Sequence, residues 1–315
     1  MTGVLKLPVV DLCSPDRPSS AASIRQACID YGIFYLVNHG VEEELIQAVF
    51  EESKKLFSLP SDEKNKLACK HLRGYTPVNP NNKGNAKESY YIGPLEDVSA
   101  QVILNQWPSE EILPLWRPTM ETYYRKVLDA GKRLLELIAM ALNLDEDFFQ
   151  RIGAVDKSAS HLRILHYPDA VGSSDEETYG ISAHSDLGTI TLLASDGVQG
   201  LQVCRENIKK PQVWEDVPHL DGALIINMGD MMERWTNCLF RSTLHRVRPA
   251  GRKRYSAAFF IDPIDDCIVE CLETCCSKSS PPRFPPIRSG DYLKEKLETY
   301  ASQGGLVRTL SFEGS

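Results

Sequence analysis

The chain has 315 residues, of which 42% are hydrophobic, 25% charged and 8% aromatic, and its formal net charge is −8. This composition excludes intrinsic disorder as the main state, and the length suffices to bury a full core in one or two domains. The acidic balance repels phosphate backbones and anionic lipids, so we expect neither nucleic acid nor a membrane surface as a partner.

The N-terminal segment MTGVLKLPVVDL contains Lys6, Pro8 and Asp11, which interrupt any apolar signal-peptide region. The sequence also lacks an unbroken apolar run of about 18 residues, the length that a membrane-spanning helix needs. We therefore expect an intracellular protein in the cytoplasm, with the nucleus as a second possible compartment.

Nine cysteines are scattered along the chain, and an odd number in a long chain favours free thiols in a reducing compartment. The only cluster consists of Cys267, Cys271, Cys275 and Cys276. It contains no CxxC pair, and the stretch CIVECL is typical of a β-strand. We therefore favour ordinary thiols over a zinc site.

The first half of the sequence predicts alternating helices and strands. Apolar periodicity and turn residues give a helix over 21–31, a buried strand over 33–37, a helix over 42–56, a loop ending in a short strand over 72–93, a long amphipathic helix over 115–142 and a short capped helix over 145–152. The loop is rich in Asn, Gly and Pro and could cover a site.

After residue 158 the sequence consists of short β-branched runs separated by turn residues, which predicts a sandwich or jelly roll. Eight segments form this pattern: HLRILHY, GISAHSD, TITLLAS, GLQVCR, ALIINMG, LHRVR, RYSAAFFI and CIVECL. A Pro-rich linker, a helix over 291–300 and a Gly-rich tail that would fray follow. We expect four interdependent regions: an N-terminal region over 1–115, a helical spacer over 116–157, a jelly-roll core over 158–265 and a C-terminal segment over 266–315.

His184 and Asp186 lie two positions apart in GISAHSDLGTITLL, where a strand passes into a turn. In an extended chain these positions face the same way, so an imidazole and a carboxylate would lie side by side. His245, at the end of another expected strand, could supply a third metal ligand. Two histidines and one carboxylate suit ferrous iron better than a closed zinc site. The motif alone is weak, because a surface histidine beside an aspartate cap has the same spacing.

Arg254 and Ser256 are also two positions apart on one expected strand, so the guanidinium and the hydroxyl would share a face. An arginine that points into a barrel needs a counter-charge, because a buried unpaired charge is strongly unfavourable. A dicarboxylate ligand would supply it in bidentate fashion. A surface salt bridge is the alternative, and the nearby His245 favours the ligand.

Eight segments carry a resemblance to a known family: LPVVDL, GIFYLVNHGV, RILHYP, AHSDLGTITLL, GLQV, INMGDMMERWTN, STLHRV and RYS. In this order and at these spacings they resemble the 2-oxoglutarate- and Fe(II)-dependent dioxygenases of the isopenicillin N synthase-like group, which is abundant in plants. The resemblance covers nearly the whole chain. It implies a mixed α and β fold, in which a distorted jelly roll (double-stranded β-helix) follows a mostly helical N-terminal region.

The resemblance also implies roles for the polar residues identified above. The family pattern makes His184, Asp186 and His245 the iron ligands. It makes Arg254 with Ser256 the clamp for the distal carboxylate of 2-oxoglutarate. With these roles, the five residues would bind the metal ion and the cosubstrate of the reaction.

Tyr167, in HYP, falls where the family's tyrosine contacts the cosubstrate. Two positions depart from the family pattern. Leu165 stands where an asparagine is common, which removes a polar contact to the cosubstrate. Cys238 replaces the glycine of a TNG turn, so a turn normally given to glycine must accept a Cβ. Neither departure touches the iron ligands or the arginine clamp.

The implied function is that of an oxidoreductase that couples 2-oxoglutarate decarboxylation and O₂ activation at non-haem Fe(II) to hydroxylation, desaturation or demethylation of a small organic metabolite. Fe(II) and 2-oxoglutarate are the implied cofactors, and ascorbate is a supporting reductant. An Fe(II) oxidase of the same fold that does not use 2-oxoglutarate is the alternative. A non-catalytic ligand-binding protein would have a broken triad or clamp, whereas all five residues are present here. The motifs specify neither the substrate nor the oligomeric state.

Three further polar residues have a structural interpretation. Strand alternation makes His166 face away from Tyr167, so we expect a packing role. His39 follows a buried strand and is expected to belong to a turn. Asp230, in NMGD, is expected in a tight turn whose side chains bond the backbone, and it is not assigned to the metal.

Three aromatic residues are candidates for lining the substrate cavity. Phe260 shares the face of Arg254 and Ser256 at even spacing, and a plain core role is its alternative. Tyr90 and Tyr91 follow the variable loop, and either could close over a substrate.

Overall fold

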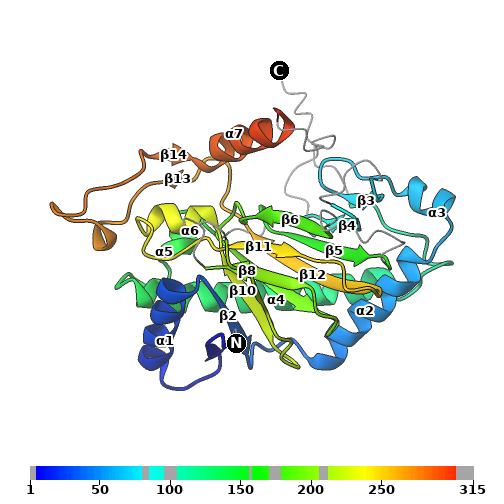
Figure 1. Cartoon of the computed structure of the whole chain (residues 1–315), viewed down its shortest axis with the longest axis horizontal. Helices are drawn as coiled ribbons and strands as arrows, with labels where there is room; N and C mark the ends of the chain where they lie inside the picture. Colours follow the sequence, from blue (N-terminus) through cyan, green and yellow to red (C-terminus); the bar gives the residue numbers. More distant parts are fainter. Residues whose placement is uncertain are drawn as a thin grey trace.

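Two β-sheets form the centre of the molecule, and helices cover the outer face of the larger one (Figure 1). The computed structural model describes residues 5–79, 85–95, 105–155, 158–169, 179–205 and 212–302. Among these residues, no helix is both long enough and apolar enough to cross a membrane.

The N-terminal part alternates short strands and helices before one long helix. Its elements are β1 (Val9–Asp11), α1 (Arg17–Asp30), β2 (Ile33–Val37), α2 (Glu43–Phe57), α3 (Ser61–Lys66), β3 (Gly74–Thr76), β4 (Glu88–Ile92), α4 (Trp116–Ala141) and α5 (Phe148–Arg151). Helix α1 begins after Asp16, whose carboxylate accepts a hydrogen bond from the Ser19 amide at 3.1 Å. Helix α2 has acidic residues in its first turn and lysines in its last, which complements the helix dipole.

The remaining strands complete the two sheets. They are β5 (His161–Tyr167), β6 (Ile181–His184), β7 (Ile190–Ser195), β8 (Leu201–Cys204), β9 (Glu215–Asp216), β10 (Leu224–Met228), β11 (Leu244–Val247) and β12 (Arg254–Ile261). The eight-stranded sheet has the order β1-β2-β10-β7-β12-β5-β4-β3, and the four-stranded sheet has the order β6-β11-β8-β9. The larger sheet therefore takes strands from both halves of the chain, which ties the N-terminal region to the core.

Side-chain alternation gives the larger sheet two different faces. On β12, Tyr255 and Phe259 belong to the cluster packed against the helices. Ala258 and Phe260 belong to a second cluster, which also contains Leu201 from the smaller sheet. Period-two alternation in β12 thus separates an outer helical core from an interior enclosed by the two sheets.

Helix α4 packs closely on the outer face of the larger sheet. It buries a long apolar stripe that includes Trp116, Tyr124 and Leu134. Gly131 is the point of closest approach, since a side chain there would collide with Ile261 of β12. This contact fixes the helix against the strand that also carries Arg254.

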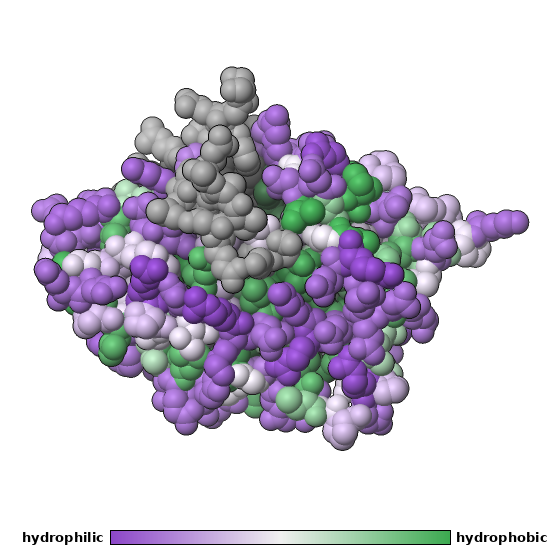
Figure 2. Space-filling view, turned by 180° about the vertical axis from the view of Figure 1, so that it is seen from behind, coloured by the Kyte–Doolittle hydropathy of each residue, from purple (hydrophilic) through white to green (hydrophobic). Residues whose placement is uncertain are grey.

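The chain ends in a small two-stranded sheet and a helix that lie to one side of the main sheets (Figure 1). These elements are β13 (Ile268–Val269), the 3₁₀ helix η1 (Glu273–Cys275), β14 (Ile287–Arg288) and α7 (Ser289–Ser302). One further short helix, α6 (Asp230–Trp235), connects β10 to β11. The face seen in Figure 2 is mostly hydrophilic where residues are described, and its apolar residues are scattered between charged ones.

Most of these elements were predicted. The strand over 33–37, the long helix to within one residue at each end, and all eight strands after residue 158 are confirmed. The helices near residues 21–31, 42–56 and 291–300 are also confirmed, with small shifts at their ends. The predicted tail after residue 302 and residues 80–84 of the predicted loop lie outside the described residues.

Several details differ from the prediction. The strands β3 and β9 and the helix α3 are too short for a periodic signal and were missed. The helix expected over 145–152 is one turn long, and its N-cap residue Asp147 makes no side-chain capping bond. The CIVECL strand lies outside the jelly roll and, among the described residues, pairs with β14 alone.

The nine cysteines agree with the prediction, since all of them are free thiols.

Candidate active site

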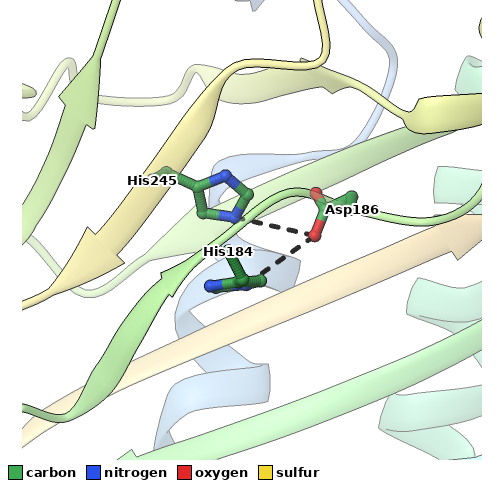
Figure 3. Close-up of side chains that lie close together, drawn as sticks. All are labelled: His184, Asp186 and His245. Atoms are coloured by element: carbon green, nitrogen blue, oxygen red, sulfur yellow. Dashed lines mark ion pairs between the residues drawn. The ribbon is translucent and has the colours of Figure 1, made fainter. Parts of the chain in front are cut away.

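His184, Asp186 and His245 converge at the smaller sheet (Figure 3). His184 ends β6 and is paired directly with His245 on the neighbouring β11, while Asp186 lies two residues beyond β6. The Nε2 atoms of His184 and His245 lie 3.9 Å and 3.6 Å from Asp186 Oδ1. Each residue offers a donor atom within 4.8 Å of the other two, an arrangement that fits one metal ion.

Backbone carbonyls fix the orientation of both imidazoles. His184 Nδ1 lies 2.9 Å from the Ser182 carbonyl, and His245 Nδ1 lies 3.1 Å from the Thr243 carbonyl. A ring nitrogen facing a carbonyl must donate, so each Nε2 keeps its lone pair for a ligand. Both histidines thus have the protonation pattern that metal binding requires.

Asn227 is a further residue of this site that the sequence motifs did not indicate. Asn227 is buried on the inner face of β10. Its side-chain amide donates a hydrogen bond to Asp186 Oδ2, with a donor–acceptor distance of 3.2 Å. This bond holds one carboxylate oxygen and leaves Oδ1 directed at the two histidines. The alternation of LIINM along a strand was the available signal, but NMGD had been interpreted as a turn.

Burial and mutual charge determine the protonation of His184 and Asp186. Burial lowers the pKa of His184 well below its ordinary value, and a charge on His245 and, more weakly, on Lys87 lowers it further. Burial opposes ionisation of Asp186, but His245 and His184 outweigh it and hold the pKa of this carboxyl below its usual range. The resulting state has an ionised carboxylate and a neutral His184, which is ready for a divalent cation.

The predicted carboxylate-binding residues also come together. Arg254 is paired with Tyr167 across β12 and β5, and its guanidinium lies over the Tyr167 ring at 4.9 Å. Its Nη1 lies 3.4 Å from Ser256 Oγ, and its Nε donates to the Val198 carbonyl at 3.0 Å. Arg254 and Ser256 therefore present donors from one face of β12, as their spacing predicts.

Arg254 is almost completely buried, with 2% of its surface exposed. Within the described part of the chain it forms no ion pair with an acidic side chain. A permanently charged guanidinium in such a place is unfavourable unless an anion neutralises it. The arrangement thus fits a ligand carboxylate bound by Arg254 and Ser256.

The two departures from the family pattern have different surroundings. Leu165 is buried opposite Ser256 and packs in the apolar cluster between the sheets, so it gives an apolar contact there. Asn237 and Cys238 both have left-handed backbone conformations, with φ of 53° and 67°. Cys238 follows α6 in this turn, where glycine would avoid the steric cost of a Cβ.

The three aromatic candidates lie in different places. Phe260 packs against the interior cluster and stacks on His161, with ring centres 4.7 Å apart. Tyr91 is half-buried beside Arg163, directly opposite it on β5. Tyr90 faces the other way: it is fully buried against Trp116, and its hydroxyl donates to the Gln106 carbonyl. The expectation that Tyr90 closes over a substrate is therefore wrong, because it is a core residue on the helical side.

The residues given a structural interpretation are placed as follows. His166 is buried on the outer face and stacks on Tyr255, which agrees with packing. His39 contacts the Gly222 carbonyl and the Val41 amide, as a turn residue does. Asp230 differs from the prediction, since it begins α6 and accepts hydrogen bonds from the side-chain hydroxyls of Ser242 and Tyr292.

Two family models match the chain. The first, described as non-haem dioxygenase in morphine synthesis N-terminal, matches residues 7–110. The second, the 2OG-Fe(II) oxygenase superfamily, matches residues 158–263, which include the His-Asp-His group and Arg254.

Similar proteins agree with these models. Kihadalactone A synthase LFS of Citrus sinensis is 41% identical over 95% of this chain and 93% of its own length. Azadirone synthase LFS of Melia azedarach is 39% identical over 94% of this chain and 93% of its own length.

Solved structures give the same result. A full-length Neurospora crassa protein in complex with alpha-KG and 5-formyluracil superimposes with a TM-score of 0.83 at 27% identity, covering 95% of this chain and 98% of that chain. JOX2 in complex with 2OG, Fe and JA superimposes with a TM-score of 0.79 at 28% identity, covering 99% of this chain and 88% of that chain. The chain belongs to the 2OG-Fe(II) oxygenase superfamily, with the double-stranded β-helix fold and the 2-oxoglutarate-dependent dioxygenase activity of that class.

Proposed function

We propose that His184, Asp186 and His245 hold the Fe(II) of this dioxygenase. Two observations support this assignment. Each histidine uses Nδ1 for a backbone carbonyl, which leaves Nε2 available to a metal ion, and the ionised Asp186 lies between the two imidazoles. Three protein ligands on one side leave positions for a cosubstrate and O₂. When bound, Fe(II) supplies the activation of O₂ that is coupled to decarboxylation of 2-oxoglutarate to succinate and CO₂.

Arg254 and Ser256 bind the distal carboxylate of 2-oxoglutarate, and Tyr167 positions the guanidinium. The observation that carries this assignment is the buried Arg254 without an acidic partner among the described residues, which shares the inner face of β12 with Ser256. A carboxylate there would restore charge balance through charge-assisted hydrogen bonds. Leu165, Leu193 and Val247 in the same interior exclude water from the bound cosubstrate.

The organic substrate is a small plant-type metabolite that is hydroxylated, desaturated or demethylated. The two plant synthases at about 40% identity support this class. Tyr91 and Phe260 are candidates for contact with it, because both lie on inner strand faces. Ascorbate supports turnover by keeping the iron reduced.

The cytoplasm is the proposed compartment, because nine free thiols are typical of a reducing environment. The proposed division of the chain is an N-terminal region over 1–115, a spacer over 116–157, a core over 158–265 and a C-terminal segment over 266–315. Strands β1 and β2 extend the core sheet, so the N-terminal region contributes to the folding of the core.

The test is succinate and CO₂ formation from 2-oxoglutarate with Fe(II) and ascorbate, while small metabolites are screened as substrates. We expect His245→Ala to abolish this turnover without unfolding the protein. His219→Ala is the matched control, because His219 is partly exposed and pairs with Asp221 away from the triad. Full turnover by His245→Ala would contradict the ligand assignment. Substrate oxidation without CO₂ release would favour the alternative oxidase that does not use 2-oxoglutarate.

A further inference from the structure

A second pair of cationic side chains faces the interior between the sheets. Arg163 lies on β5, two and four positions before Leu165 and Tyr167, and so on the same face as these interior residues. Tyr91 is paired with Arg163 across β4 and β5. Lys87 lies four positions before Tyr91, immediately before β4.

The backbone around Lys87 connects β4 to the smaller sheet. The Ala86 amide donates to the Tyr179 carbonyl at 2.9 Å, and the Gly180 amide donates to the Val247 carbonyl of β11 at 2.8 Å. These bonds bring the start of β4 beside the strands that carry the two ligand histidines (Figure 1). Lys87 therefore lies near the strands that carry His184 and His245, on the strand face that Ser89 and Tyr91 share.

Neither cation is neutralised by an acidic side chain in the described ranges. Lys87 is 9% exposed, and its ammonium donates to Asn85 Oδ1 at 2.8 Å. Arg163 Nη2 lies 3.5 Å from Ser89 Oγ, and its guanidinium lies 4.7 Å from the centre of the Tyr91 ring. Its buried Nε has no hydrogen-bond partner in the part of the chain that the structure describes. Burial and, to a lesser extent, the charge of Arg163 lower the pKa of Lys87, which confirms that the two groups are close.

This pair lies beside the Arg254 clamp but has its own contacts. Glu88 is paired with His166, so Lys87, one residue earlier, lies at the level of Tyr167, whereas Arg163 lies four residues from Tyr167, about 13 Å along an extended strand. The Arg163 guanidinium reaches back toward Lys87, because its Nη2 lies 3.5 Å from the Oγ of Ser89, two positions from Lys87 on the same strand face. Arg254 contacts Tyr167 and Val198, whereas Arg163 contacts Tyr91 and Ser89. A carboxylate held by Arg254 and Ser256 therefore does not neutralise Arg163, which has no acidic partner among the described residues.

We propose that Lys87 and Arg163 form a second anion-binding subsite, which holds a carboxylate group of the organic substrate. A carboxylate between them would pair with the ammonium and the guanidinium and would satisfy the free Nε of Arg163. The Ser89 hydroxyl and the Tyr91 ring border the same place. This inference rests on the proposed function and narrows its substrate to carboxylic acids.

The experiment measures binding to the anaerobic Fe(II) enzyme saturated with 2-oxoglutarate, so that the Arg254 clamp is filled. The probes are cinnamate, 3-phenylpropanoate and indole-3-acetate, each compared with its methyl ester by titration calorimetry. We expect at least one acid to bind roughly tenfold or more tightly than its ester, as hydrogen bonds to charged groups allow. Lys87→Met and Arg163→Met should bring the acid-to-ester ratio close to one.

The control variant is Lys66→Met, which makes the same change at an exposed lysine paired with Glu63 on α3. It should keep the ratio of the wild type. The affinity for 2-oxoglutarate should be unchanged in all three variants, and Lys87→Met should raise the midpoint of thermal unfolding, because it removes a buried unpaired cation.

Three results would overturn the inference: equal binding of acids and esters, no binding of any acid, or an acid preference that survives in the Lys87→Met/Arg163→Met double variant. Failure of the wild-type enzyme to bind 2-oxoglutarate would instead contradict the proposed function. The two failures are therefore distinguishable in one set of titrations.

Discussion

Buried charged side chains on the two faces of the larger sheet differ in whether they have a partner of opposite charge. On the outer face, Glu88 accepts hydrogen bonds from Lys64 at 2.8 Å and from the Tyr75 hydroxyl, and it lies 2.7 Å from His166 Nδ1. On the inner face, Arg254 and Lys87 are buried without an acidic partner in the described part of the chain. The outer charges are neutralised within the protein, whereas the inner charges are those that we propose to bind ligand carboxylates.

This difference separates structural charge from functional charge. A buried pair that is complete within the chain is costly to break, because one partner is left uncompensated. A buried charge whose partner is a ligand can be removed at little cost to folding, but at a large cost to binding. Mutations on the outer face should therefore mainly lower the free energy of unfolding, whereas mutations on the inner face should mainly weaken ligand binding.

The largest expected effect on stability is at Glu88. Glu88→Ala removes the counter-charge of Lys64, whose side chain is only 12% exposed, so the free energy of unfolding should fall by about 3–5 kcal/mol. Urea denaturation measures this change. Glu51→Ala is the matched control: its pair with Lys54 is exposed, and the expected change is less than about 1 kcal/mol. A similar loss of unfolding free energy in the two variants would contradict the view that the outer charges stabilise the fold.

A smaller effect is expected at Asn227, which orients Asp186 from the inner face. Asn227→Ala should weaken metal binding by roughly 10- to 100-fold, because residues that support metal ligands commonly have effects of this size. Competition with a metal-sensitive dye measures the affinity. Asn227→Asp places a second carboxylate beside Asp186 and tests whether the amide donor itself is required. Unchanged metal affinity in Asn227→Ala would show that the hydrogen bond does not orient the ligand.

The acid side of the stability profile should also depend on Glu88. Burial raises its pKa, but hydrogen bonds from His166, Lys64 and Tyr75 outweigh burial and hold the pKa below its ordinary value. The stabilisation is then complete above the unfolded-state pKa of about 4.3 and is lost as the pH falls through the lower folded-state value. Unfolding free energies between pH 7 and pH 3 should therefore fall less steeply in Glu88→Gln than in the wild type. Parallel profiles would contradict this role.

The sequence predicted the metal group because its geometry is local. His184 and Asp186 lie two positions apart, with Asp186 just beyond the end of β6, and His245 is paired directly with His184 on β11. The same local rule could not decide between Tyr90 and Tyr91. Adjacent residues on a strand face opposite ways, and pairing with β5 determines which one faces the interior.

Other features depend on contacts that the sequence does not display. The bond from Asn227 to Asp186 joins two strands that are distant in the chain. The unpaired state of Lys87 and Arg163 depends on which side chains surround them, since Glu88, the acidic neighbour of Lys87 in sequence, faces the opposite side of the sheet. Composition and spacing can identify a cation, but its counter-charge is found only in three dimensions.

The most direct test of the contrast between the two faces is Arg254→Leu, studied by 2-oxoglutarate titration and by urea denaturation of the same preparation. We predict that the dissociation constant for 2-oxoglutarate rises by roughly 30-fold or more, while the free energy of unfolding falls by less than about 1 kcal/mol or rises. Wild-type affinity for 2-oxoglutarate, or a loss of stability as large as that of Glu88→Ala, would contradict the assignment of Arg254 to a ligand.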